Sequence, residues 1–231
     1  MYLQNRSIVR SLLRFFFRLL YNEFAWTYDL VSWTVSVGQW REWQRQVIPR
    51  IVGGHVLEIA HGTGDLQIDL ANASCQSIAV DLSPYMGRLA QRKLARRNLS
   101  PRFARGMVQA LPFPSNHFTT IVSTFPTEFI ADPNAVREFW RVLAPGGRFV
   151  CVPAATILPS HLADRLARWL FEVTGQSGAP QPPKGSIGGQ PDGSDWPPKL
   201  AQTYRAAGFE VKIETVPLPR SLVWVILAEK R

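Results

Sequence analysis

An apolar strand, a turn with two glycines and the start of a helix follow one another in Val56-Leu-Glu-Ile-Ala-His-Gly-Thr-Gly-Asp65. The pattern predicts a strand over 55–60 and a helix over 65–73. Because glycine has no Cβ, Gly62 and Gly64 let backbone N–H groups approach a ligand closely where the strand ends and the helix begins. We therefore expect a ligand-binding loop between these two elements.

The next predicted strand ends in a carboxylate. Residues 77–81 form a short apolar run that closes with Asp81, at the same edge of the sheet as the glycine turn. There the carboxylate can accept hydrogen bonds from both hydroxyls of a ribose. A dehydrogenase fingerprint would need a third glycine at position 67, where the chain has Gln67. An adenosyl ligand without a pyrophosphate fits this loop better.

Strands and helices continue to alternate along the chain. Ser83-Pro84 and Asp132-Pro133 each combine a capping residue with a proline in the first turn, and both predict the start of a helix. The elements expected after the second strand are a helix to about 98, strands over 103–107 and 120–124, a helix from 132 to about 143, and a strand over 148–152. This alternation predicts an α/β fold with a parallel sheet and ligand sites at the carboxyl ends of its strands.

Composition and charge narrow the classes of function. The chain has 231 residues, 46% of them hydrophobic, which allows a sizeable core and excludes a disordered protein. Its net charge is +9, and residues 82–127 contain basic but no acidic residues, so we expect an anionic partner such as nucleic acid, a membrane surface or an acidic substrate. Cys75 and Cys151 are far apart, and no His or Cys pair has the spacing of metal ligands. We expect neither a disulfide scaffold nor a metal site.

The first 20 residues have the pattern of a basic amphipathic helix. Four arginines recur every four residues, and leucines and phenylalanines fall on the opposite side. The arginines are Arg6, Arg10, Arg14 and Arg18. This composition is typical of a helix in a membrane interface, and the alternative is a helix that packs on the domain with its arginines solvated. Because the arginines interrupt the apolar run, we expect neither a signal peptide nor a membrane span.

Four motifs follow one another in the chain. They are the glycine loop quoted above, Asp81-Leu-Ser-Pro-Tyr-Met86, Ala110-Leu-Pro-Phe113 and Arg141-Val-Leu-Ala-Pro-Gly-Gly147. In this order and spacing they resemble the class I S-adenosylmethionine (SAM)-dependent methyltransferases. The stretches Phe24-Ala-x-x-Tyr28-Asp29-Leu30 and Ser36-x-Gly38-x-x-Arg41-x-Trp43 are similar to the N-terminal motif of the ubiquinone/menaquinone-biosynthesis C-methyltransferases. The resemblance implies a Rossmann-like fold: a seven-stranded, mostly parallel sheet with helices on both faces and an antiparallel last strand, plus N-terminal amphipathic helices and a loop-rich insertion.

The resemblance also implies which residues bind SAM. The full set is Tyr28, Glu58, Ala60, His61, Gly62, Gly64, Asp81, Leu82, Met86, Met107, Val108, Gln109 and Thr124. Asp81 would bind the ribose, and Tyr28 would lie near the methionine end. Leu82 and Met86 would pack on the adenine.

Three positions depart from the family pattern. His61 stands where Cys or Ser is usual, and Thr119 replaces the Asp that normally follows Phe118. Met107 stands where the family usually has an Asp that reads the adenine amino group. The backbone of Val108 or the side chain of Gln109 could take over that contact.

We expect a single methyltransferase domain over 1–231. Its segments are an N-terminal helical cover (1–50), a SAM-binding core (55–153), a substrate-cover insertion (154–198) and a C-terminal helix with strands (199–231). Aromatic residues are frequent in the N-terminal cover, and we assign most of them to the core and the others to an apolar pocket. The insertion combines an amphipathic helix with a loop rich in Gly and Pro, and we expect both to close over a lipophilic acceptor.

The sequence assigns no catalytic residue. Glu128 follows the fourth strand and could accept a proton, or be an exposed loop residue, and His161 could reach the substrate from the insertion. We assign His61 to polar packing near the methionine carboxylate, and His55 and His117 to structural positions. Methyl transfer needs little acid–base chemistry, because the sulfonium is already activated.

The first hypothesis is therefore a SAM-dependent methyltransferase acting on a lipophilic small molecule, with a quinol-type ring carbon as acceptor. Alternatives are a phospholipid or amine N-methyltransferase, an RNA-binding methyltransferase and a non-catalytic SAM-binding partner protein. The RNA hypothesis comes from a run of basic residues: Arg88, Arg92, Lys93, Arg96, Arg97, Arg102 and Arg105. The spacing of four between Arg88, Arg92 and Arg96 fits a solvated helix face, and we expect no nucleic-acid partner. We expect a cytoplasmic protein with peripheral membrane contact through 6–20. The sequence defines neither the methylated atom nor the oligomeric state.

Overall fold

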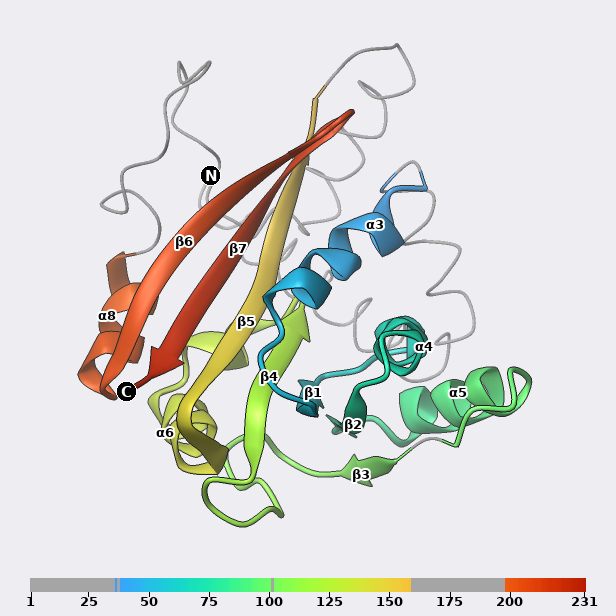
Figure 1. Ribbon diagram of the computed structural model, residues 1–231, viewed down its shortest axis with the longest axis horizontal. Helices are drawn as coiled ribbons and strands as arrows, with labels where there is room; N and C mark the ends of the chain where they lie inside the picture. Colours follow the sequence, from blue (N-terminus) through green and yellow to red (C-terminus); the bar gives the residue numbers. More distant parts are fainter. Residues whose placement is uncertain (1–35, 37, 101, 159–197) are drawn as a thin grey trace, which may run out of the picture.

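The computed structural model describes residues 36, 38–100, 102–158 and 198–231 (Figure 1). The expected N-terminal amphipathic helix, Tyr28, His161 and the helix and loop of the insertion lie outside these residues.

A seven-stranded sheet in the order β3-β2-β1-β4-β5-β7-β6 forms the centre of the protein (Figure 1). The strands are β1 His55–Ile59, β2 Gln76–Asp81, β3 Phe103–Arg105, β4 Phe118–Thr124, β5 Leu143–Ile157, β6 Phe209–Leu218 and β7 Ser221–Lys230. The strands from β3 to β5 pair in parallel, whereas β7 is antiparallel to both of its neighbours, β5 and β6. The fold class expected from the sequence is confirmed.

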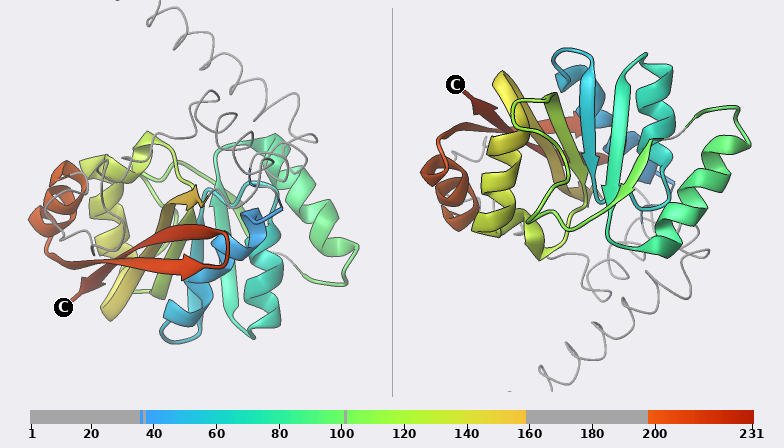
Figure 2. Two further views of the ribbon diagram at one scale, coloured as in Figure 1. Left: turned by 90° about the horizontal axis from the view of Figure 1, so that it is seen from above. Right: turned by 90° about the horizontal axis from the view of Figure 1, so that it is seen from below.

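Helices cover both faces of this sheet (Figure 2). They are α3 Trp40–Gln44, the 3-10 helix η2 Arg45–Arg50, α4 Asp65–Asn72, α5 Pro84–Ala95, the 3-10 helix η3 Glu128–Ala131, α6 Pro133–Val142 and α8 Pro198–Ala206. Side chains of α3, η2 and α4 pack on one face, and those of α6 and α8 pack on the other. Successive strand residues point to opposite faces, so Val122 of β4 joins the first cluster and Ile121 joins the second. Within the described ranges, no helix is long and apolar enough to cross a membrane.

Both helix starts predicted from capping pairs are confirmed. The Ser83 hydroxyl accepts a hydrogen bond from the Met86 N–H at 3.3 Å, and α5 begins at the following proline. The Asp132 carboxylate accepts from the Asn134 N–H at 2.9 Å, and α6 begins in the same way. Each side chain satisfies one of the N–H groups that a helix leaves without a partner in its first turn.

The fifth strand is much longer than predicted. β5 starts at Leu143 and passes through Gly146 and Gly147, whereas the predicted strand covered only 148–152. Gly147 makes this possible, because a Cβ at that position would lie 2.9 Å from the Thr119 carbonyl oxygen. At its other end β5 pairs with β7 as far as Ile157, so the first residues assigned to the insertion belong to this strand. Pairing with distant strands extends β5 beyond its apolar run.

Two other elements are shorter than predicted. α5 ends at Ala95 instead of about 98, and Asn98 has a left-handed φ of 56°, a conformation that asparagine tolerates but a helix excludes. β3 comprises only Phe103–Arg105, because only these three residues pair with β2.

The N-terminal segment from Ser36 onward is fixed to the sheet by Trp43. This side chain is fully buried, and its Nε1 donates a hydrogen bond to the Ser221 hydroxyl of β7 at 2.8 Å. Arg41 and Arg45 both form ion pairs with Asp69 of α4, at 2.9 and 3.0 Å. The expectation that aromatic residues of this segment join the core is confirmed for Trp43.

Candidate active site

The loop after β1 contains two glycines that share a left-handed backbone conformation but differ in their surroundings. Gly62 and Gly64 have φ values of 53° and 82°, in the left-handed region. A Cβ at Gly62 would meet nothing within 4 Å, whereas a Cβ at Gly64 would lie 2.8 Å from the Ala90 Cβ of α5. Gly64 therefore allows close packing of two elements, and Gly62 leaves open space beside the loop backbone.

Asp81 lies at the end of β2, beside this loop. The β1–β2 register pairs Ile59 with Val80, which places Asp81 next to Ala60. Its Oδ2 accepts from the Gly62 N–H at 3.0 Å, and its Oδ1 accepts from the Ser83 N–H at 2.8 Å. An ionised carboxylate has about four acceptor positions, so Asp81 can still accept hydrogen bonds from a ligand.

Glu58 is buried directly before the loop. The residue is 2% exposed, and its Oε2 accepts a hydrogen bond from the Gln67 amide at 2.6 Å. The Gln67 amide oxygen accepts in turn from the Ser77 hydroxyl at 2.9 Å. Burial raises the pKa of Glu58 to about 8, so the carboxyl is mostly protonated at pH 7. Gln67, where a dehydrogenase would have glycine, is therefore the residue that positions Glu58.

His61 packs toward the β3 side of the loop. Its ring lies 4.6 Å from the Phe103 ring, centroid to centroid, and its Nδ1 donates to the Gly62 carbonyl at 2.9 Å. Burial lowers the pKa of the imidazole, although the charge of Asp81 acts in the opposite direction. His61 is therefore a neutral, packed side chain at pH 7.

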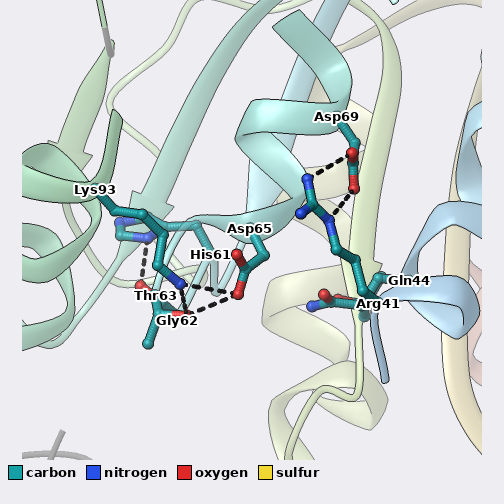
Figure 3. Close-up of polar contacts among 9 residues, drawn as sticks. Arg41, Gln44, His61, Gly62, Thr63, Asp65, Asp69 and Lys93 are labelled. Carbon is teal, nitrogen blue, oxygen red and sulfur yellow. Dashed lines mark hydrogen bonds and ion pairs between the residues drawn. The ribbon is translucent and has the colours of Figure 1, made fainter. Parts of the chain in front are cut away.

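Lys93 of α5 forms hydrogen bonds with the loop and with the first residue of α4. Its Nζ donates to the Asp65 carboxylate at 2.9 Å and to the Thr63 hydroxyl at 3.1 Å (Figure 3). In the sequence Lys93 is one of several basic residues on a predicted helix, and no local signal separates it from the exposed arginines. Only the packing of α5 beside α4 shows its contact with the loop.

Comparison with known proteins identifies the family. A family model described as a methyltransferase domain matches residues 56–147. The chain is 31% identical over 215 residues to the demethylmenaquinone methyltransferase of Deinococcus radiodurans, and the match covers 86% of each chain. It is 30% identical over 217 residues to the demethylmenaquinone methyltransferase of Symbiobacterium thermophilum, covering 83% of this chain and 84% of the relative. The chain belongs to the demethylmenaquinone methyltransferase family of SAM-dependent methyltransferases.

A solved structure supports the fold of this methyltransferase. The SAM-dependent methyltransferase of Aquifex aeolicus superimposes with a TM-score of 0.55 at 15% identity, over 81% of this chain and 89% of that one. The cofactor of the methyltransferase is SAM. The loop fits such a group, because Gly62 leaves space beside the backbone and Asp81 keeps acceptor capacity for ribose hydroxyls.

Exposed apolar side chains lie next to Asp81 in the methyltransferase. Leu82 is 58% exposed and Met107 is 56% exposed, so both can cover a flat aromatic ligand group. Met86, which the sequence also assigned to adenine packing, is 1% exposed and belongs to the buried core. Of the residues assigned to or near the adenine, Leu82 and Met107 therefore remain as the exposed apolar ones.

The two residues considered as readers of the adenine amino group differ in their surroundings. Val108 is half-buried and packs against the core. The Gln109 amide donates to the Asp132 carboxylate at 2.8 Å, at the start of α6, and so connects the segment after β3 to that helix. The Gln109 amide keeps its oxygen as an acceptor and one N–H as a donor for a ligand.

Thr124 is the last residue of β4, on the other side of β1. Its hydroxyl accepts from the Gln44 amide at 3.2 Å, which brings a residue of α3 to this edge of the sheet. The next residue, Phe125, has a left-handed φ of 50°, and its ring stacks on Trp40 at 4.0 Å between centroids. The sequence includes Thr124 in the cofactor set, whereas Gln44 is a contact that the sequence did not indicate.

The remaining candidates are spread over the molecule. Glu128 is exposed and begins η3, in the segment after β4. His55 and His117 lie together at the opposite edge of the sheet, where β1 and β4 begin, with 6.2 Å between their ring centroids. No group of three or more His, Cys, Asp or Glu among the described residues could hold a metal ion.

Proposed function

We propose that this methyltransferase transfers the methyl group of SAM to a ring carbon of a lipophilic quinol. The observation that carries the proposal is the identity of 30–31% with two demethylmenaquinone methyltransferases over more than four fifths of both chains. A naphthoquinol with a prenyl tail is therefore the acceptor to test first.

In the proposed cofactor site, Asp81 of β2 and Thr124 of β4 lie on opposite sides of β1. Bound SAM supplies an electrophilic methyl group on its sulfonium. Asp81 would hold the ribose, and Leu82 with Met107 would cover the adenine, so the reactive end of SAM would lie toward β4 and Thr124. Orienting the acceptor in line with the sulfonium would then provide much of the rate.

Methylation of a ring carbon also needs a proton acceptor for the quinol hydroxyl. Glu128, in the exposed segment after β4, is a candidate among the described residues. A Glu128→Gln variant that methylates normally would exclude this role.

We also propose a cytoplasmic protein that contacts membranes peripherally. The helix expected over 6–20 lies outside the described residues, but α5 offers a second basic surface. Arg88, Arg92 and Arg96 are exposed along this helix, and none has an acidic partner in the part of the chain that the structure describes. An unpaired basic surface favours anionic lipid, and a lipophilic acceptor is found in the same membrane.

Methyl-labelled SAM tests the proposal directly. The purified protein is incubated with demethylated naphthoquinol under reducing conditions, and in parallel with phosphatidylethanolamine and with RNA. We expect label in the quinol alone, on a ring carbon located by mass spectrometry of fragments. Label in the lipid amine or in RNA would replace the proposed acceptor, and no label with any acceptor would favour a non-catalytic SAM-binding protein.

A further inference from the structure

Gln44 carries a buried polar atom that nothing in the described chain satisfies. Its side-chain nitrogen donates to the Thr124 hydroxyl at 3.2 Å, while its Oε1 is buried and has no hydrogen-bond partner among the described residues. Removing a carbonyl oxygen from water without a replacement donor is unfavourable. Buried amide oxygens are normally paired, so a missing partner at the edge of a ligand site points to a donor on the ligand.

The loop between β1 and α4, residues 60–64, is called the cofactor loop below. The position of Gln44 relative to this loop follows from the sheet register. β1 and β4 pair Glu58 with Val122, and the Ser123 hydroxyl donates to the Ile59 carbonyl at 3.0 Å. The next step of this register places Thr124 beside Ala60, where the cofactor loop begins. Adjacent strands are about 4.8 Å apart, so the Gln44 amide lies close to the start of the loop.

The two sides of β1 therefore carry different polar groups. Asp81 of β2 lies on one side of the loop, and Gln44 lies on the other, beside β4. Figure 3 shows the Gln44 side chain extending from α3 toward the side on which Gly62 and Asp65 lie. If Asp81 holds the ribose, with the adenine over Leu82, the amino-acid part of the cofactor extends toward Gln44.

Gln44 is held in this position by contacts on both sides of it in the chain. Arg41 and Arg45 each make two hydrogen bonds to the Asp69 carboxylate, which fixes the segment to α4. One turn earlier, Trp40 stacks on Phe125, whose left-handed backbone is strained for a residue with a Cβ. An amide restrained in this way presents its oxygen in one direction before a ligand arrives.

We propose that Gln44 Oε1 accepts a hydrogen bond from the α-ammonium group of bound SAM. The amino-acid part of SAM has one donor group, the ammonium, because its carboxylate only accepts. The inference rests on the cofactor orientation given in the proposed function, and it does not depend on the identity of the methyl acceptor. Gln44 is in this sense a cofactor-binding residue supplied by the N-terminal segment.

Calorimetric binding of three ligands tests the proposal. They are S-adenosylhomocysteine, its analogue without the amino group, and 5′-methylthioadenosine, which lacks the amino-acid part. Hydrogen bonds to charged groups are the stronger ones, so we expect Gln44→Leu to weaken S-adenosylhomocysteine by roughly tenfold or more and the other two by less than about twofold. The control is Gln46→Leu, since the Gln46 amide donates to the Glu42 carbonyl at 3.1 Å on the same segment. This control should bind all three ligands as the wild type does.

Several results would overturn the proposal. An equal loss for all three ligands would assign Gln44 to packing, and unchanged binding of S-adenosylhomocysteine would remove Gln44 from the cofactor site. Thr124→Val provides a second variant should Gln44→Leu not fold, because it removes the hydroxyl that orients the amide. We expect it to show a smaller loss with the same ligand selectivity, and no selectivity would count against the proposal. A failure to methylate quinol would affect only the proposed acceptor and would leave this contrast between ligands intact.

Discussion

Gly64 lies directly against Ala90, and the two residues bring the loop between β1 and α4 into contact with α5. A Cβ at Gly64 would come to 2.8 Å from the Ala90 Cβ, and Gly64 has a φ of 82° at the residue that precedes α4. Neither the space nor the backbone conformation admits a larger residue. The loop therefore depends on α5 as much as on the strand before it.

We expect Gly64→Ala to lower the free energy of unfolding by about 2–4 kcal/mol, because it adds left-handed strain and a steric overlap. Urea unfolding measures the change. Gly87→Ala in α5 is the matched control, since a Cβ there would meet nothing within 4 Å. Alanine is the better helix former, so this control should gain roughly 0.5–1 kcal/mol. Equal effects of the two substitutions would contradict the packing argument.

The buried Glu58 makes stability depend on pH. Its pKa is about 8 in the folded protein, from an ordinary value of 4.5, mainly because of burial. The folded protein keeps a proton that the unfolded chain releases, so this group lowers stability as pH rises from 4.5 to about 8.

We expect Glu58→Gln to remove this loss, since glutamine is neutral at both ends of the range. Relative to the wild type, the variant should gain up to a few kcal/mol, on the order of 3–5, between about pH 5 and about pH 9. Unfolding by urea at several pH values checks this. If the free energy of unfolding changed with pH in the same way in both proteins, Glu58 would be ionised in the folded protein over this pH range, and the raised pKa would be wrong.

Asp69 connects the N-terminal segment to α4 through Arg41 and Arg45. Burial acts to raise the pKa of Asp69, but hydrogen bonds from Arg41 and Arg45 outweigh it and leave the pKa below 3.8. The stabilisation is therefore complete above pH 3.8 and is lost as pH falls through the lowered value.

We expect Asp69→Asn to cost about 1 kcal/mol, since both arginines are partly solvated, and to increase amide hydrogen exchange over 40–50. Arg45 is 52% exposed and Arg41 is 35% exposed, so we expect Arg45→Gln to cost less stability than Arg41→Gln. Unchanged exchange in this segment with Asp69→Asn would show that its other contacts, such as that of Trp43 with Ser221, hold it without the ion pairs.

The basic surface of α5 predicts binding to anionic vesicles. Replacing Arg88, Arg92 and Arg96 together by Gln should weaken co-sedimentation with phosphatidylserine vesicles by roughly fivefold per arginine removed, if each interacts with the surface. The control is Arg137→Gln, an exposed arginine on α6. Neutral vesicles should bind the wild type and the triple variant equally. Loss of a strongly salt-dependent RNA affinity in the triple variant, with vesicle binding unchanged, would assign this surface to nucleic acid.

Much of the α/β core could be predicted because its signals act over a few residues. Ser83 and Asp132 cap their helices through neighbouring N–H groups, and Gly62 lies in a turn set by its own backbone. The proximity of Asp81 to the glycine turn could also be predicted from the sequence, since parallel strands bring their carboxyl ends to one edge of the sheet. The length of β5 could not be predicted, because its extension depends on pairing with β7, more than 60 positions away in the chain.

The sequence alone established the strand-loop-helix unit, the order of the elements and the type of cofactor. Tertiary structure was needed to bring Gln44 to Thr124 and Trp43 to Ser221, which are 80 and 178 positions apart. The burial of Glu58, which raises its pKa to about 8, also depends on the tertiary structure. Periodicity and capping depend on local backbone geometry, whereas these contacts depend on which strands are neighbours and on which segment covers their ends. Only the packed sheet contains that information.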